Sequence, residues 1–218
     1  MKERVWDLPT RLFHWALVLL IALSWWSAET GRTSLHLWFG YGALFLLFFR
    51  ILWGFLGSST ARFSAFVRGP GAVVEYVRNR FRWPVVGHAP LGAVSVLALL
   101  ALLLIQVGTG LFAMDEDGLF PGPLAYLVSV GASDALTELH EELFDWLLIL
   151  ISLHIAAILL YRLVLGRNLL GPMITGKADL PRGMEPMRPA TPLVAIFCTL
   201  VAIAATAWIL FGAPPLGS

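Results

Sequence analysis

Two histidines in one apolar stretch could bind an iron cofactor. His140 and His154 lie fourteen residues apart within residues 138–165. On a helix this spacing separates them by roughly 21 Å along the axis and makes just under four turns, so both rings point to the same side. Histidine in a membrane-spanning helix is costly and usually indicates a functional site. Two of them near opposite faces of a bilayer indicate two haem irons.

The composition indicates an integral membrane protein. Hydrophobic residues make up 58% of the 218 residues and charged residues 13%, and the mean hydropathy is +0.79. A soluble core of this size cannot bury that much apolar chain. The single cysteine, Cys198, excludes an internal disulfide, a Cys-ligated iron–sulfur cluster and a covalent haem attachment motif. Any haem is therefore expected to be non-covalent.

Five apolar runs approach the length that spans about 30 Å of hydrocarbon. The predicted spans cover residues 12–26, 35–55, 91–113, 143–165 and 193–211. The first run resembles a signal peptide, but its basic leader is long and a histidine interrupts it, so we expect a retained helix. Ser133 or Asp134 is the expected N-cap of the fourth helix, and Thr191–Pro192 the expected start of the fifth. Residues 73–81 predict a short amphipathic surface helix, with Arg82 and Trp83 at the lipid interface.

The basic residues predict the orientation of the spans. Of the 15 Lys and Arg residues only Arg32 falls in a segment predicted to lie outside, whereas the loop at 114–137 is acidic and carries none. Basic loops stay on the cytoplasmic side of a membrane. The sequence therefore predicts a multi-pass membrane protein with its N-terminus in the cytoplasm and its C-terminus on the outside.

Four histidines fall at two depths in this topology. His14 and His154 are expected toward the cytoplasm, and His36 and His140 toward the outside. A b-type haem needs two axial imidazoles at one depth, so we predict the pairs His14–His154 and His36–His140. Any one of them could instead be an ordinary histidine of the membrane interface. Two matched layers are harder to explain in that way.

Four further residues are candidates for contact with these cofactors. Gly40 follows His36 by one turn and Gly57 lies one turn past Trp53, so a flat macrocycle could approach the backbone at either glycine, although small residues also serve helix packing. Arg50 lies fourteen residues after His36, level with the cytoplasmic haem, and could bind a propionate or snorkel to head groups. His88 is left over from the pairing, so it is not expected to be an axial ligand. It could hydrogen-bond a propionate or a quinone oxygen, or simply lie in the interface.

Several segments together resemble a known family. These are VWDLPTRLFHW, FRILWGFLGSSTARFSAFV, GHAPLGA and LHEELFDWLLILISLHIAAILLYRLV. They are similar to the bacterial cytochrome b561 and Ni,Fe-hydrogenase b-type cytochrome superfamily, over residues 5 to about 176. The resemblance implies a four-helix transmembrane bundle that binds two haem b groups through His14, His36, His140 and His154. We therefore expect an all-α integral membrane protein with a haem-binding domain at 1–176, and a linker and additional transmembrane helix at 177–218.

The leading functional hypothesis is a dihaem cytochrome that carries electrons across the membrane, between the quinone pool and a periplasmic partner. A c-type cytochrome or redox enzyme is the expected partner, docking on the acidic segment 115–138. Quinone or quinol and membrane lipid are the other expected partners, with no nucleic acid. Activity as a quinol or quinone oxidoreductase stays open. One alternative is a haem-bearing anchor subunit of a dehydrogenase or hydrogenase. A less favoured one is a metal or proton transporter, whose binding groups would converge near the midplane.

Overall fold

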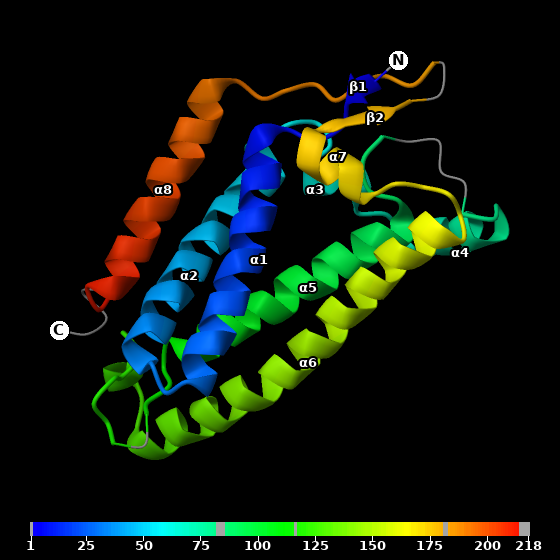
Figure 1. Cartoon of the computed structure of the whole chain (residues 1–218). Helices are drawn as coiled ribbons and strands as arrows, with labels where there is room; N and C mark the ends of the chain where they lie inside the picture. The colour runs from blue at the N-terminus through cyan, green and yellow to red at the C-terminus, as the bar shows by residue number, and fades with distance from the viewer. Residues whose placement is uncertain (1, 82–85, 116, 181–182, 214–218) are drawn as a thin grey trace. The chain divides into compact units, whose positions relative to one another are not determined.

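Long helices dominate the computed structural model, which describes residues 2–81, 86–115, 117–180 and 183–213. In these residues, five helices are long and apolar enough to cross a membrane (Figure 1): α1 (Leu8–Glu29), α2 (Thr33–Leu56), α5 (Pro90–Gly110), α6 (Val130–Leu163) and α8 (Pro192–Leu210). Helices satisfy their backbone hydrogen bonds internally, as hydrocarbon requires. The predicted all-α membrane class is confirmed.

Short elements connect the long helices. They are β1 (Lys2–Arg4), α3 (Phe63–Phe66), α4 (Pro70–Arg78), the 3₁₀ helix η1 (Ala125–Leu127), α7 (Leu170–Thr175) and β2 (Lys177–Asp179). Helix α4 corresponds to the predicted amphipathic segment, displaced by three residues at each end. Arg82 and Trp83, which were expected at the interface, lie outside the described residues.

The predicted start of one long helix agrees with the structure, and the predicted start of another differs. Helix α8 begins at Pro192 as predicted. The N-cap prediction for the fourth helix was wrong, because α6 already begins at Val130 and Ser129 Oγ accepts from the Ala132 N–H at 3.3 Å. The polar first turns of α6 contain strong helix formers such as Ala, Leu and Glu, which extend the helix beyond its apolar part.

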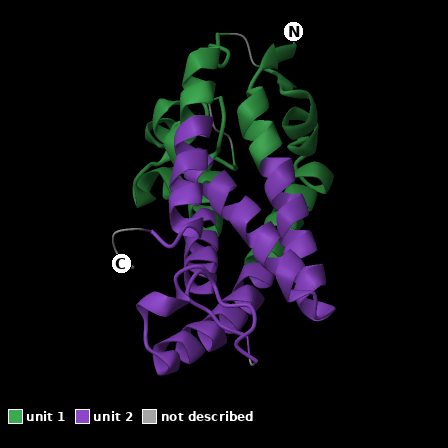
Figure 2. Ribbon diagram, turned by 90° about the vertical axis from the view of Figure 1, so that its left-hand side faces the viewer, with its two compact units in different colours: residues 1–13, 50–99, 150–198 green, residues 14–49, 100–149, 199–218 purple. Residues whose placement is uncertain are grey.

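The chain divides into two compact units (Figure 2). Unit 1 comprises Met1–Phe13, Arg50–Leu99 and Leu150–Cys198, and unit 2 comprises His14–Phe49, Leu100–Ile149 and Thr199–Ser218. Each long helix therefore contributes one part to each unit. The units differ from the predicted domains at 1–176 and 177–218, which were drawn on sequence resemblance rather than on contacts and stay a prediction.

Unit 1 is held together at the chain's N-terminal end by hydrogen bonds. Strand β1 pairs antiparallel with β2, with Glu3 opposite Ala178. Asp7 then accepts from the Thr10 N–H at 2.7 Å and from Trp53 Nε1 at 3.1 Å, and it also accepts from the Ser58 hydroxyl. One carboxylate thus caps the first turn of α1 and joins it to the end of α2.

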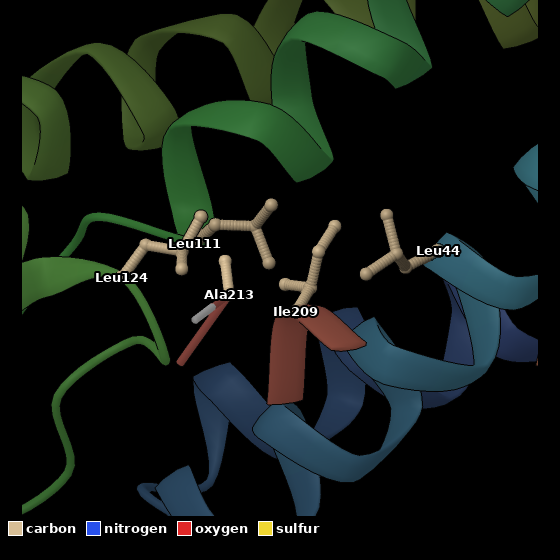
Figure 3. Close-up of a cluster of buried hydrophobic side chains, with 5 residues drawn as sticks. All are labelled: Leu44, Leu111, Leu124, Ile209 and Ala213. Carbon is tan, nitrogen blue, oxygen red and sulfur yellow. The ribbon is translucent and has the colours of Figure 1, made fainter. Parts of the chain in front are cut away.

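Unit 2 has an apolar core in which the C-terminal helix takes part. Figure 3 shows Leu44 of α2 and Ile209 of α8 with three side chains from the adjoining segments; the buried cluster is Leu44, Leu111, Leu124, Ile209 and Ala213. The Tyr126 hydroxyl also donates to the Gly212 carbonyl. In this unit the fifth helix therefore takes part in the protein core.

Replacing Asp7 by alanine should lower the free energy of unfolding by about 2–3 kcal/mol, because donors to a charged acceptor lose their partner. Thermal unfolding in detergent measures this. Glu185→Ala is the control. Glu185 pairs with Arg188 at 2.5 Å, but its side chain is 76% exposed, so the change should stay within about 0.5 kcal/mol. Equal effects of the two substitutions would contradict the role given to Asp7.

Candidate functional site

The most complete candidate site lies in unit 2, where α2 and α6 bring two histidines together. The ring centroids of His36 and His140 are 6.0 Å apart, and their planes make an angle of 88°. Both residues are half-buried. The structure thus brings together one of the two predicted pairs, from positions more than a hundred residues apart in the sequence.

This spacing suits two imidazoles that share one metal ion. Two metal–nitrogen bonds of about 2 Å, and about 1 Å more from each nitrogen to its ring centre, separate the ring centres by about 6 Å. The value of 6.0 Å agrees with that requirement. The residues present therefore fit an iron held between the two rings.

The hydrogen bonds of the two rings also leave the correct nitrogen for a metal. His36 Nδ1 lies 3.0 Å from the Ser24 carbonyl oxygen, and His140 Nδ1 lies 2.8 Å from the Gln106 carbonyl oxygen. A carbonyl oxygen can only accept, so each Nδ1 carries the proton and each Nε2 keeps a lone pair. Metal-binding histidines commonly donate their other ring N–H to a carbonyl in this way.

The glycines predicted to line a cofactor site behave differently from one another. A Cβ added at Gly40 would meet no other atom within 4 Å, which leaves open space beside α2 one turn after His36. At Gly57 it would lie 2.4 Å from the Trp53 carbonyl oxygen and 2.7 Å from the Trp53 ring. Gly57 therefore allows close packing on Trp53. The expectation that a macrocycle could approach the backbone at Gly57 is wrong, because the indole already fills that space.

The other predicted pair is divided between the two units. His154 lies in unit 1, where its Nδ1 is 3.3 Å from Ser95 Oγ. His14 lies in unit 2, with its ring edge against Trp15 at a centroid distance of 4.9 Å. The pairing of His14 with His154 stays a prediction.

Arg50 is a buried cation in unit 1. Only 3% of it is exposed, and its guanidinium carbon lies 4.9 Å from the centre of the Phe63 ring. Asp7 acts electrostatically on its charge. Among the described residues, the Nη1 atom is buried and has no hydrogen-bond partner. A buried cation with an unused donor favours a bound carboxylate, such as a haem propionate, over snorkelling to head groups.

His88 is held between two aromatic rings in unit 1. Its ring centroid is 4.6 Å from that of Trp6 and 4.5 Å from that of Phe66. Burial, followed by the nearby Arg50 and His154, lowers the pKa of His88 to about 3 from its usual 6.5. The ring is therefore neutral at physiological pH, and its buried Nδ1 has no partner in the described part of the chain.

An apolar cavity of about 350 Å³ adjoins the His36–His140 site in unit 2. Its walls are Ile105, Gly108, Thr109, Phe112, Val128 and Leu136. Thr109 also lies 3.2 Å from His140 Nδ1, measured from its hydroxyl oxygen. Among the described residues, no group of three or more His, Cys, Asp or Glu side chains could hold a metal ion.

Several residues around the histidines were not singled out from the sequence. Gln106 and Thr109 contact His140, Ser95 contacts His154, and Trp6 and Phe66 enclose His88. Polar residues within an otherwise apolar helix usually face the protein interior, so this pattern could have indicated Gln106, Thr109 and Ser95. No sequence signal indicates Trp6 or Phe66.

Comparison with known proteins gives one family. The model of the family described as prokaryotic cytochrome b561 matches residues 5–176, which is most of the chain. No curated protein matches the chain, and no solved structure matches it.

Proposed function

Since the chain belongs to the prokaryotic cytochrome b561 family, we propose that it is a dihaem carrier that moves electrons across the bacterial cytoplasmic membrane. Membership and the five long helices make it a multi-pass membrane protein that binds b-type haem and transfers electrons. The number of haems, their ligands, the orientation and the partners belong to the proposal.

The observation that carries the proposal is the geometry of His36 and His140. Their ring centres are 6.0 Å apart, and each Nδ1 donates to a backbone carbonyl. The open space at Gly40 supports a flat group beside His36. We assign His36 and His140 as the axial ligands of one haem.

The second haem is assigned to His14 and His154. The support in unit 1 is chemical: Arg50 is a buried cation with an unused donor, so it can bind a propionate there. His88 is neutral and enclosed by aromatic rings. We therefore give it no axial role and assign it a hydrogen bond to a propionate or to a quinone oxygen.

When bound, each haem supplies an iron that accepts and gives up one electron. The chain's histidines would hold this iron from both sides, which would leave no open site on it for a substrate. Exchange with quinone or quinol would then have to occur beside the bound group rather than on its iron. The chain is in this view primarily a carrier, and a quinol or quinone oxidoreductase activity depends on that contact.

The orientation and the second candidate function rest on charge and on the fifth helix. The basic segments support a cytoplasmic N-terminus and a periplasmic C-terminus. Ile209 of α8 packs in the core of unit 2, while Leu193, Leu200 and Phe211 of the same segment are exposed. Such a face suits lipid or the membrane subunit of a dehydrogenase or hydrogenase, for which the chain would be the haem-bearing anchor.

Alanine substitution of each histidine tests the ligand assignment. His36→Ala and His140→Ala should remove the same haem, and His14→Ala and His154→Ala the other, so haem per polypeptide falls by about half. His88→Ala is the control and should keep both haems. Redox titration with haem quantification identifies which centre is lost. If His14→Ala and His140→Ala depleted one centre while His154→Ala spared it, the pairing would be wrong.

Arg50→Leu should lower the midpoint potential of one haem, because a nearby positive charge favours the reduced form. Loss of about 1.4 kcal/mol corresponds to about 59 mV for a one-electron couple, and a shift of about 40–60 mV is expected. Arg62→Leu is the matched control, since Arg62 is exposed and its side chain donates only to the Gly57 carbonyl among the hydrogen bonds described. Unchanged potentials in Arg50→Leu would exclude the propionate role.

The acidic start of α6 should steer a positively charged soluble partner, such as a c-type cytochrome. Exposed carboxylates recur there one turn apart, at Asp134, Glu138 and Glu142, with Glu141 and Asp145 beside them. The electron-transfer rate should fall on the order of tenfold from low to high salt. Neutralising Asp134, Glu138 and Glu142 should weaken that dependence, and Glu75→Gln on α4 should leave it unchanged. If the electron-transfer rate of the unmodified protein did not depend on salt, electrostatic steering by this segment would be wrong.

A further inference from the structure

The last turn of α5 lies unusually close to the ring of His140. A Cβ added at Gly110 would lie 2.8 Å from His140 Cε1 and 3.1 Å from its Nδ1. A separation under 3 Å does not occur for real Cβ atoms, so either the ring or the helix would have to move. Glycine at this position therefore allows the imidazole to rest directly on the backbone of α5.

Two hydrogen bonds prevent the ring from moving away. His140 Nδ1 donates to the Gln106 carbonyl at 2.8 Å, and Gln106 Nε2 donates in return to the His140 carbonyl at 2.9 Å. The Thr109 hydroxyl donates to the same Gln106 carbonyl at 2.9 Å and lies 3.2 Å from Nδ1. Only 8% of Gln106 and 7% of Thr109 is exposed. One turn of α5 thus contacts the backbone, the ring nitrogen and the ring face of a single residue.

The three contacts control different properties of the ring. The Gln106 carbonyl fixes the tautomer in which Nε2 has the lone pair, because Nδ1 must carry the proton to donate. The bond from Gln106 Nε2 fixes the backbone position from which the ring projects. Gly110 sets how far the ring can turn, and with it the 88° angle to the His36 ring.

We propose that Gln106, Thr109 and Gly110 are positioning residues that fix the tautomer and the plane of His140, and so determine the ligand field of the haem bound by His36 and His140. This inference rests on the proposed function, because it takes His140 as an axial ligand. It extends that function to a helix that contributes no histidine of its own.

Gly110→Ala is the decisive variant, and Gly108→Ala is its matched control. A Cβ at Gly108 meets no other atom within 4 Å, so both variants make the same change in the same helix, but only one methyl group meets the ring. The full-length haem-loaded protein is measured by its ferric low-spin electron paramagnetic resonance spectrum, its haem content and its two midpoint potentials. The affected centre is identified as the one that His36→Ala removes.

Gly110→Ala should alter the spectrum and potential of that centre or deplete it by about half or more, and leave the other centre unchanged. Gly108→Ala should match the unmodified protein at both centres. If Gly110→Ala behaves like Gly108→Ala, the positioning role is wrong. If Gly110→Ala does not fold, Gln106→Leu decides. That variant removes the bond to the His140 carbonyl, so a change confined to the same centre supports the inference and unchanged centres overturn it.

His140→Ala separates this inference from the proposed function. If His140→Ala removes the same centre as His36→Ala, His140 is a ligand, and any failure of the Gly110 test counts against positioning alone. If His140→Ala keeps both haems, the ligand assignment itself fails.

Discussion

A helix in hydrocarbon satisfies its own backbone, so a polar side chain inside it must find its partner on another helix or on a bound group. The histidines and arginine of this chain are arranged under that constraint. His36 and His140 each direct one ring nitrogen to a carbonyl of a neighbouring helix. Each ring then has a single nitrogen left to bind a metal ion.

The same constraint acts differently on Arg50 and His88 in unit 1. Arg50 keeps its charge in a setting of aromatic rings, with Asp7 as the neighbouring carboxylate. Asp7 already accepts from Thr10, Trp53 and Ser58. His88 loses its charge instead, because burial and the adjacent cation disfavour the imidazolium form. An anionic group in this region would therefore be attracted by Arg50, while His88 could offer it only a neutral hydrogen bond.

Much of the fold could be predicted from the sequence, because apolar length and charge placement decide which segments span a membrane. The proximity of His36 and His140 followed from depth alone, since helix direction and residue number determine how deep a side chain lies. The start of α6 was missed because hydropathy detects the lipid-spanning part of a helix and not its polar extension. Gly57 was misread, and the positioning turn at Gln106 was not seen, because spacing along one helix does not tell which neighbour faces it. The links from Asp7 to Trp53 and Ser58 depend on tertiary packing, which no local pattern records.

The pairing of β1 with β2 constrains the order in which the chain can fold during synthesis. Glu3 is opposite Ala178, so the first strand has no partner until the ribosome has made the last strand. At about 5–20 residues per second this takes roughly 10–35 s. During that time the N-terminal segment must stay on the side of the membrane where β2 will emerge, after the preceding helices have entered the bilayer. Strands β1 and β2 can therefore pair only after α1, α2, α5 and α6 have been inserted, with the segments before α1 and after α6 on the same side of the membrane.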